Sequence, residues 1–506
     1  MLWIWISTTA FAADLVVDVG DDWCATLTAA EAGDRVLLAA GTHTGTCRVT
    51  PAGTADSPIT LTAQDAERRA TLTSTDSSAN LLDLDGGHIV VEGLDFGPTE
   101  VNVEAIRMHA GELVTVRDCA FSFIGGQSIV ASTAGAAYSG LTIEDNTFED
   151  ITGAAVTIGC YAGAVDCSAG DVVVQRNRVR GVTGGDGIVL ESDATGSILR
   201  NTISGTAGPA VRVGGDVSEL GGVEEPLEGG LPNTMVEQNH LVGSGSSYAL
   251  VIDGGPVVVR NNIVVSGLSG GLSVADPTNN GRMNHIHVIG NSITGTDGPA
   301  VTLTDWEADG TLAFANNGIW DATAPGAGVP AAVGDHPWGG NVDCSSETAC
   351  FEDIMAGDPS PRGGGELPGQ GIVLESGFLA ADLCNDGRIL GSPSGALTTS
   401  LAEPLLLSSD TDPTVHCVSG GDDTGDDTAS DTASDSGDDV DVDPGDDTPG
   451  GGIDTALEPD LPRWSAAFKA GEKGGVGCST AGVATGWLAV FLGILASARR
   501  RAQSSG

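Results

Sequence analysis

The chain has 506 residues, including 75 glycines and 22 prolines, and a formal net charge of −48. Glycine is roughly twice as frequent as in ordinary proteins, yet the apolar fraction of 40% still supports a packed core, which excludes a collagen and a wholly disordered chain. The charge opposes binding to nucleic acid, because phosphate backbones would be repelled. It is compatible with divalent cations, and equally with a general acidity that serves solubility or a salty habitat.

The N-terminus has the features of a short secretory signal. Residues 1–12 hold an apolar run followed by Ala10-Phe11-Ala12, a small-x-small cleavage pattern. The alternative is a buried first strand. Residues 13–75 are expected to form an N-terminal cap and the first coils of the repeat described next, and Ala25–Ala32 predicts a short helix before a Gly33-Asp34 turn.

Two interleaved patterns repeat through residues 76–320. In the first, apolar-x-x-slot-x-apolar, nine slot residues span 94 to 317 with a mean spacing of about 28 residues. The slots are Leu94, Cys119, Asn146, Asn177, Asn201, Asn239, Asn261, Asn291 and Asn317. In the second, small-apolar-x-apolar, the copies lie at 105–108, 128–131, 155–158, 187–190, 210–213, 249–252, 271–274 and 300–303.

These patterns predict an all-β coil of parallel strands. Each copy is a short strand with one face inward, and the turn residues leave no room for helices between strands. About 10 such coils, stacked about 4.8 Å apart, would form a monomeric rod roughly 50 Å long. The slot asparagines tolerate left-handed backbone angles and bond to neighbouring backbone, which predicts a structural ladder at one corner.

The period, the asparagine slots and the opening Gly33-Asp34-Arg35-Val36-Leu37-Leu38-Ala39-Ala40-Gly41-Thr42-His43 resemble the right-handed parallel β-helix proteins of the pectate lyase-like superfamily, chondroitinase B-like members especially. The resemblance covers roughly residues 14–400. It implies a right-handed, single-stranded parallel β-helix. It does not imply a reaction, because the superfamily includes lyases, hydrolases, epimerases, adhesins and non-enzymatic surface proteins.

The C-terminal third is expected to have three parts. Residues 321–417 match the repeat poorly and are expected to form C-terminal coils and overlying loops. Residues 418–462 are rich in Asp, Thr, Ser and Gly and predict a disordered acidic stalk, because they lack apolar surface and repel one another. Residues 463–506 combine glycines, Cys478 in a Gly-Cys-Ser sequence, an apolar segment 481–498 and Arg499-Arg500-Arg501.

That last combination resembles the myxobacterial C-terminal sorting signal called MYXO-CTERM. The resemblance covers about 30 residues and implies export, processing near Cys478 and attachment at the outer cell surface. The alternative is an ordinary transmembrane tail anchor, since 18 apolar residues barely cross a bilayer. In either case the membrane is contacted only through the C-terminal segment.

Ten cysteines in an exported chain are expected to pair. The spacings predict Cys24–Cys47, Cys160–Cys167, Cys344–Cys350 and Cys384–Cys417, and partners within the last two pairs are interchangeable. Cys478 belongs to the sorting signal. Cys119 occupies an interior slot, where a free thiol behaves as a small hydrophobe.

Carboxylates gather just after the second strand of successive coils. Glu191, Asp193, Asp216 and Asp253 are candidate Ca²⁺ ligands, followed by Asp276 and Asp305 in the same edge. The alternative is that they are solvated turn residues.

Three basic residues are candidate catalytic groups. Arg212 is predicted to face outward between Val189 and Val251, beside these carboxylates, and Arg107 and His109 share one strand face. Elimination from a uronic acid needs a cation and a base, and Arg212 is the candidate base beside Ca²⁺. A lysine base is excluded from the repeat, because both lysines, Lys469 and Lys473, lie beyond the acidic segment. Each of the three is alternatively an ordinary exposed polar residue.

Other chemistries have weaker support. The Asn-Thr-Asp, Asp-Asp and Gly-His-Gly motifs of polygalacturonases are absent from the repeat, and His285 with His287 lacks a third metal ligand. The leading hypothesis is therefore an exported, surface-anchored rod that binds polysaccharide or other surface material. The competing hypothesis is a calcium-dependent polysaccharide lyase or related carbohydrate-active enzyme that uses an arginine base.

Overall fold

The structure is a computed structural model. It describes residues 12–160, 167–191, 193–214, 234–243, 245, 247–275, 286–304, 312–324, 328, 338–353 and 358–361. These all belong to the first of two compact units, Met1–Gly425, and the second unit is Asp426–Gly506. The predicted signal, the stalk 418–462 and the segment 463–506 lie outside the described residues. Within the described ranges no helix is long and apolar enough to cross a bilayer.

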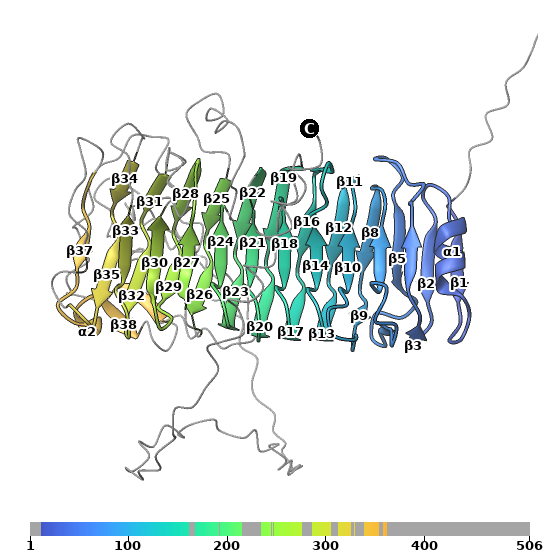
Figure 1. The fold of residues 1–506 in the computed structure, drawn as a ribbon, viewed down its shortest axis with the longest axis horizontal. Coiled ribbons are helices and arrows are strands. Elements are labelled where there is room, and N and C mark those ends of the chain that lie inside the picture. Colours follow the sequence, from blue (N-terminus) through green and yellow to red (C-terminus); the bar gives the residue numbers. More distant parts are fainter. Residues whose placement is uncertain are drawn as a thin grey trace, which may run out of the picture. The chain divides into compact units, whose positions relative to one another are not determined.

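The described coils form an all-β, right-handed parallel solenoid with three sheets, which we call A, B and C (Figure 1). Sheet A contains β1 (Asp14–Val17), β2 (Arg35–Leu38), β5 (Ile59–Ala63), β8 (Ile89–Glu92), β12 (Val114–Arg117), β16 (Thr142–Glu144), β19 (Ser168–Gln175), β22 (Ala194–Leu199), β25 (Thr234–Glu237), β28 (Val257–Arg260), β31 (Ile286–Ile289), β34 (Leu312–Ala315) and β36 (Trp338–Gly339), with β11 (Gly111–Glu112) and β15 (Ala137–Ser139) at its side.

Sheets B and C complete each coil in turn. Sheet B contains β3 (Gly41–Thr44), β6 (Ala70–Thr73), β9 (Asp95–Phe96), β13 (Ala120–Ile124), β17 (Thr147–Ile151), β20 (Arg178–Val182), β23 (Thr202–Thr206), β26 (His240–Gly243), β29 (Ile263–Val265), β32 (Ser292–Gly295), β35 (Gly318–Asp321) and β37 (Val342–Asp343). Sheet C contains β4 (Cys47–Val49), β7 (Leu82–Leu84), β10 (Ile106–Met108), β14 (Ile129–Ala131), β18 (Val156–Ile158), β21 (Ile188–Leu190), β24 (Val211–Val213), β27 (Tyr248–Ile252), β30 (Gly270–Ala275) and β33 (Val301–Thr304).

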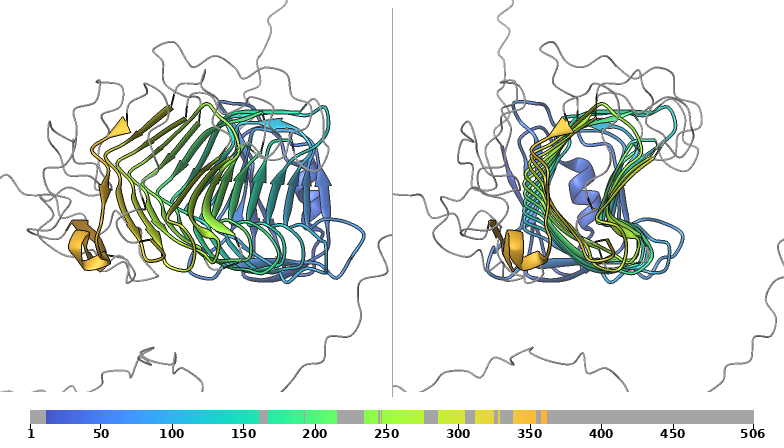
Figure 2. Two further views of the ribbon diagram at one scale, coloured as in Figure 1. Left: turned by 60° about the vertical axis from the view of Figure 1, so that its left-hand side comes forward. Right: turned by 90° about the vertical axis from the view of Figure 1, so that its left-hand side faces the viewer.

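Two short helices flank the coils. Helix α1 (Trp23–Ala29) begins two residues before the predicted Ala25–Ala32, because Asp22 caps it by accepting a hydrogen bond from the backbone N–H of Ala25 at 2.9 Å. Its Trp23 joins the core, and the helix lies across one end of the solenoid (Figure 2). Helix α2 (Glu347–Cys350) precedes a hairpin of β38 (Phe351–Asp353) and β39 (Asp358–Pro361).

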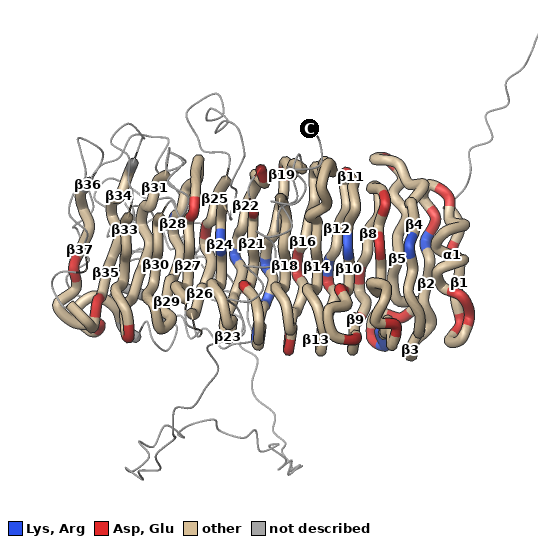
Figure 3. The backbone as a smooth tube through the Cα atoms, in the orientation of Figure 1, with Lys and Arg blue, Asp and Glu red and all other residues tan. Residues whose placement is uncertain are grey.

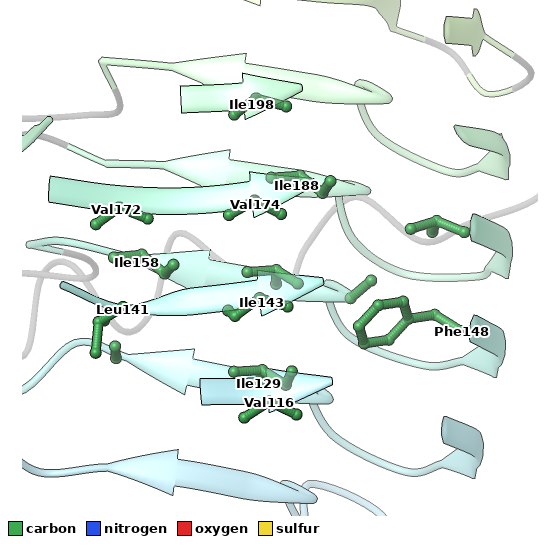
Figure 4. Close-up of a cluster of buried hydrophobic side chains, with 14 of the residues drawn as sticks. Val116, Ile129, Leu141, Ile143, Phe148, Ile158, Val172, Val174, Ile188 and Ile198 are labelled. Carbon is green, nitrogen blue, oxygen red and sulfur yellow. The ribbon is translucent and has the colours of Figure 1, made fainter. Parts of the chain in front are cut away.

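Alternating side chains fill the interior. Inward residues from all three sheets form one continuous hydrophobic core, part of which Figure 4 shows from Val116 to Ile198. Phe96, Phe121 and Phe148 stack with ring centroids 4.8 and 4.9 Å apart, the spacing of the coils themselves. Burial of these rows, rather than local propensity, therefore fixes the winding.

A ladder of buried asparagines runs along the corner between sheets A and B. The side-chain oxygen of Asn146 accepts from the backbone N–H of Cys119 at 3.0 Å. Each later side-chain oxygen accepts from the backbone N–H and the side-chain N–H of the preceding asparagine; for Asn177 and Asn146 both distances are 3.0 Å. Its members are Asn146, Asn177, Asn201, Asn239, Asn262, Asn291, Asn317 and Asn341. Every described coil from β16 onward therefore closes this corner with side-chain hydrogen bonds.

The prediction was wrong in two details of this ladder. The slot is Asn262, not Asn261. The valine-rich strand fits the sequence pattern in either of two registers, and the structure pairs Val236 with Val259. Because Asn239 and Asn262 each follow these valines by three residues, Asn262 occupies the slot. The left-handed residue is the one before each slot, as in Asp145 and Asn261, both with φ of 56°. That position turns the chain and leaves the slot side chain pointing inward.

Three predicted disulfides are present: Cys24–Cys47, Cys160–Cys167 and Cys344–Cys350. Cys119 is free and buried, and burial raises the pKa of its thiol to about 12. Cys384, Cys417 and Cys478 lie outside the described residues.

Candidate functional site

The outward face of sheet C places two of the predicted site residues, Arg107 and Arg212, in one line. Because the strands are parallel and in register, one outward residue per coil forms a column with steps of about 4.8 Å. In coil order the column is Arg48, Asp83, Arg107, Val130, Thr157, Val189, Arg212, Val251, Ser273 and Thr302. Arg212 thus lies between Val189 and Val251, as predicted, four steps or about 19 Å from Arg107.

Arg212 is held between two carboxylates. Its Nε donates to Asp186 at 2.8 Å, and its Nη1 donates to Asp253 at 3.0 Å. Asp186 comes from the turn before β21, and Asp253 directly follows β27. Burial alone would lower the pKa of Arg212, but the charges of Asp186 and Asp253 outweigh that effect, so its pKa lies above the usual value. Arg212 is therefore a donor to ligands and a poor proton acceptor.

Gly208 makes room for this arrangement. A Cβ atom added there would overlap the Oδ1 atom of Asp186. The backbone N–H of Gly208 donates to Gly185 O at 2.9 Å, which fixes the turn in place. A side chain at position 208 would accordingly push Asp186 away from Arg212.

The predicted calcium ligands are not all together. Glu191 directly follows β21, and Asp253 directly follows β27. The coil that contains β24 lies between these two strands, and Gly214 takes the equivalent position in it. Asp193 is exposed, with a φ of 55°. In the part of the chain that the structure describes, no three His, Cys, Asp or Glu side chains are placed to hold a metal ion. Asp216, Asp276 and Asp305 lie outside that part, so the four-residue calcium site stays a prediction.

A second polar cluster surrounds Arg107 and His109. Nε2 of His109 lies 2.9 Å from Oδ1 of Asp83, and the amide of Asn80 donates to the same oxygen at 3.0 Å. Arg107 contacts both oxygens of Glu104 at 2.8 and 2.9 Å through Nη1, and Nη2 donates to the carbonyl of Ser132.

Arg48 extends this cluster to the next coil. Its guanidinium donates to both oxygens of Asp85, at 2.7 and 3.0 Å. The hydrogen bond from Arg48 lowers the pKa of Asp85. Figure 3 shows such basic and acidic positions side by side along the solenoid.

An apolar stretch separates the two clusters. Val130, Thr157 and Val189 face outward but are at most 3% exposed, and the hydroxyl of Thr157 hydrogen-bonds Gln127. His287 lies on sheet A, away from this column, and His285 is outside the described residues. The face of sheet C therefore has two ionic clusters at the ends of an apolar centre.

Sequence reasoning missed Asp83, Glu104 and Asp186. Extending the small-apolar-x-apolar pattern one coil toward the N-terminus reaches Leu82-Asp83-Leu84, which would have identified Asp83. Glu104 and Asp186 lie in turns, whose residues carry no periodic signal. Only the packed coils bring them to the arginines.

Comparisons with known proteins give one match to a family model and several distant similarities to solved structures. Residues 104–220 match the family model described as the right handed beta helix region. An alginate lyase from Paenibacillus sp. str. FPU-7 is 16% identical, with a TM-score of 0.37 and coverage of 61% of this chain and 94% of its own. The A-module of the mannuronan C-5 epimerase AlgE4 from Azotobacter vinelandii is 13% identical, with a TM-score of 0.44 and coverage of 61% and 87%.

Pectate lyase Pel9A is 12% identical, with a TM-score of 0.36 and coverage of 77% of this chain and 97% of its own. No curated protein matches. At these identities and scores the solved structures support no argument about activity, and the match to the right-handed β-helix model concerns the repeat itself.

Proposed function

We propose that this chain is an exported, surface-anchored β-helix protein that binds polysaccharide along the outward face of sheet C. The observation that carries the proposal is the column from Arg107 to Arg212, with ionic clusters at both ends of a buried apolar stretch. The two clusters are about 19 Å apart along the column, so a polysaccharide chain would contact both of them at once. The residues between the clusters are at most 3% exposed and would lie beneath the ligand without contacting it.

The ionic clusters supply the groups that sugar hydroxyls need. Guanidinium N–H groups donate and carboxylate oxygens accept, and both kinds lie within each cluster. Their mutual ion pairs fix the side chains before the ligand arrives, so little conformational entropy is lost on binding. Since Arg212 has a raised pKa, the geometry around it favours binding over proton abstraction.

The test is affinity for a panel of neutral and acidic polysaccharides, measured by titration calorimetry with the full chain. Arg107→Ala and Arg212→Ala are each expected to weaken binding at least about tenfold. Arg117→Ala is the matched control, because Arg117 is also paired, to Glu92 at 2.6 Å, but on sheet A. Absence of binding across the panel, or an equal loss in the control, would contradict the proposal.

A second candidate function is a polysaccharide lyase, favoured by the Asp83–His109 pair beside Arg107. With Nε2–H donated to Asp83, Nδ1 of His109 keeps a lone pair for a proton. His109 would take the proton from the sugar carbon that bears the carboxylate. The electrons of that C–H bond would form the new C=C bond of the sugar. The C–O bond to the leaving sugar then breaks, and that oxygen takes the proton from His109.

Absorbance of unsaturated products separates these functions. If the chain is a lyase of this kind, the signal grows on an acidic polysaccharide and is lost in His109→Gln. If the calcium-dependent route through Arg212 operates instead, the signal requires Ca²⁺ and is lost in Arg212→Ala. Binding without any product supports the first proposal.

Export and anchoring form a separate part of the proposal, supported by the sequence of residues 463–506. We expect the chain at the outer cell surface, where added protease removes it from intact cells. Cys478→Ala is expected to abolish this display if processing occurs near that residue. Display that is unchanged in Cys478→Ala but lost on deletion of 481–498 would indicate an ordinary tail anchor.

A further inference from the structure

Basic residues gather on two neighbouring coils of this acidic chain. Residues 172–185 contain three arginines and no Asp or Glu, and residues 194–214 contain two arginines and no Asp or Glu. These arginines are Arg176, Arg178, Arg180, Arg200 and Arg212. In a chain with 69 acidic and 21 basic residues, the two segments reverse the charge locally. Arg212 lies on sheet C with its two carboxylates, and the other four arginines lie on a different face.

The register places these four arginines at the corner between sheets A and B and on the adjoining outer face of sheet B. Arg176 and Arg200 occupy the same left-handed position before successive ladder asparagines, with φ of 54° and 55°. Arg178 and Arg180 both face outward on β20, because Val179 between them belongs to the core. The surface is about 13 Å long along the first coil, and the second coil lies about 4.8 Å away.

Hydroxyl groups continue this surface on the second coil. In sheet B, Arg178 pairs with Thr202 and Arg180 pairs with Ser204. Both Thr202 and Ser204 are partly exposed, and neither hydroxyl has a hydrogen-bond partner in the part of the chain that the structure describes. We call the whole set the basic patch; it consists of Arg176, Arg178, Arg180, Arg200, Thr202 and Ser204.

The two corner arginines of the patch differ in their partners. Arg176 donates to both oxygens of Asp145, at 2.8 and 2.7 Å, and to Glu144 at 2.7 Å. Arg200 contacts no carboxylate among the described residues; its Nε donates to the neutral Oε1 atom of Gln238 at 2.9 Å. Because Arg200 lies beside Arg176, a like charge opposes it and no described carboxylate balances it. An anion bound at Arg200 would remove that repulsion.

The surroundings of the patch restrict the kind of anion. On the coil before it, Glu149 is opposite Arg180. On the coil after it, His240 is opposite Thr202, and burial lowers the pKa of His240 to about 4, so this side is neutral at pH 7. A nucleic acid strand carries a charge every 3.4 Å or so and would be repelled by the carboxylates on the first side and by the net charge of −48. The patch therefore favours a ligand with fewer charges and many hydroxyl groups.

We propose that the basic patch binds the carboxylate groups of an acidic polysaccharide. Arginine presents its donors in a fixed fork that matches the two oxygens of a carboxylate, and these hydrogen bonds are strengthened by charge. The hydroxyls of Thr202 and Ser204 can donate to and accept from sugar hydroxyls. This inference does not rest on the proposed function, because it uses no residue of the column on sheet C.

Titration calorimetry with the full chain tests the inference. The probes are an oligosaccharide of uronic acids and its methyl ester, which has the same sugars and no charge. The double variant Arg107→Ala/Arg212→Ala is the background, because it disrupts both clusters on sheet C. In this background the acidic oligosaccharide is expected to bind at least about tenfold more tightly than the ester, since only the acid pairs with guanidinium groups. Added salt is expected to weaken binding of the acid alone.

Single substitutions in that background locate the site. Arg200→Gln is expected to weaken binding of the acidic oligosaccharide about tenfold. Glutamine fits the left-handed backbone there, because Gln238 occupies the same position on the next coil with a φ of 57°. Arg178→Thr, which repeats the residue of the coils on either side, is expected to have a similar effect. Arg35→Gln is the matched control, because it removes an exposed arginine from β2. An unchanged urea midpoint shows that each variant is folded.

Three results would overturn the inference: no binding of the acidic oligosaccharide in the background, equal affinity for its methyl ester, or an equal loss in Arg35→Gln. Tighter binding of a single-stranded DNA oligomer that is lost in Arg200→Gln would also overturn it, by assigning the patch to nucleic acid. Failure of the proposed function gives a different result. In that case the double variant binds both probes as the unmodified chain does, and Arg200→Gln still weakens binding of the acid.

Discussion

The early and late coils of this solenoid stabilise the same corner with different kinds of side chain. At the corner between sheets A and B, the early coils place Leu94 and Cys119 in the slot and stack phenylalanines beside it. From Asn146 onward the slot is an asparagine bonded to the next asparagine. The corner of the early coils therefore depends on apolar packing, which tolerates substitution. The corner of the late coils depends on buried hydrogen bonds, and a substitution there leaves buried polar groups without partners.

On the outer faces the order is reversed: the early coils are polar and the late coils are apolar. Early coils expose polar residues such as Thr115 and Thr147, whereas late coils bury Val258 and Ile263 at the equivalent positions. A polar ladder inside and an apolar layer outside thus coincide in the late coils. The comparison shows that parallel stacking fixes where a side chain lies but leaves its chemistry open.

The largest expected effect comes from breaking the ladder. Asn239 donates to Ile198 O at 2.8 Å and to Asn262 Oδ1 at 2.9 Å, and its own oxygen accepts from Asn201. Asn239→Ala is expected to lower the free energy of unfolding by at least about 3 kcal/mol, because several buried polar groups lose partners. Cys119→Ala, at the same slot in an early coil, is expected to cost only about 1–2 kcal/mol. Urea unfolding measures both; equal costs would contradict the contrast.

His240 provides a pH-dependent test. It faces outward on β26, is 9% exposed, and neither ring nitrogen has a hydrogen-bond partner among the described residues. Burial lowers its pKa to about 4. Between pH 6.5 and 4 the unfolded chain binds the proton and the folded chain does not, so stability falls as the pH falls, by about 3 kcal/mol at pH 4.

The variant His240→Phe is expected to remove this part of the pH dependence. The measurement is the midpoint of urea unfolding at pH 7 and at pH 4.5, in both proteins. His109→Phe is the control, because His109 is partly exposed and contacts Asp83. A pH dependence that survives in His240→Phe would assign the effect to other groups.

A smaller effect is expected at the turn that supports Arg212. Gly208→Ala displaces Asp186 and is expected to weaken polysaccharide binding about five- to tenfold, by loosening one of the two partners of Arg212. Gly170→Ala is the control, because a Cβ atom there meets nothing within 4 Å. Unchanged affinity in Gly208→Ala would separate Asp186 from the binding site.

The smallest expected effect is a stabilisation. Phe123 has a φ of 55° and is 62% exposed, and Gly181 and Gly205 occupy the same turn in later coils. Phe123→Gly is expected to raise the free energy of unfolding by up to about 1 kcal/mol, since glycine adopts this conformation without strain. A calorimetric melt would detect it. A lower melting temperature would show that the exposed ring contributes to folding.

Much of the architecture was predictable because it repeats. Spacing of apolar residues located the strands, and the outward position of Arg212 followed from period 2. The register failed at Asn261, where two adjacent asparagines and a run of valines satisfy the pattern equally well. The structure decides it by giving the left-handed position to Asn261 and the slot to Asn262.

The candidate site was predictable only in part. Arg107, His109 and Arg212 lie on periodic strands, so their faces could be assigned. Their partners Glu104 and Asp186 come from turns, where no period applies.

The sequence by itself determined the winding of this chain, because burying apolar rows at a fixed spacing permits few other arrangements. The tertiary structure alone decided which carboxylates neutralise each arginine and which arginines lie side by side. Those outcomes depend on residues that are distant in sequence and meet only when the coils stack.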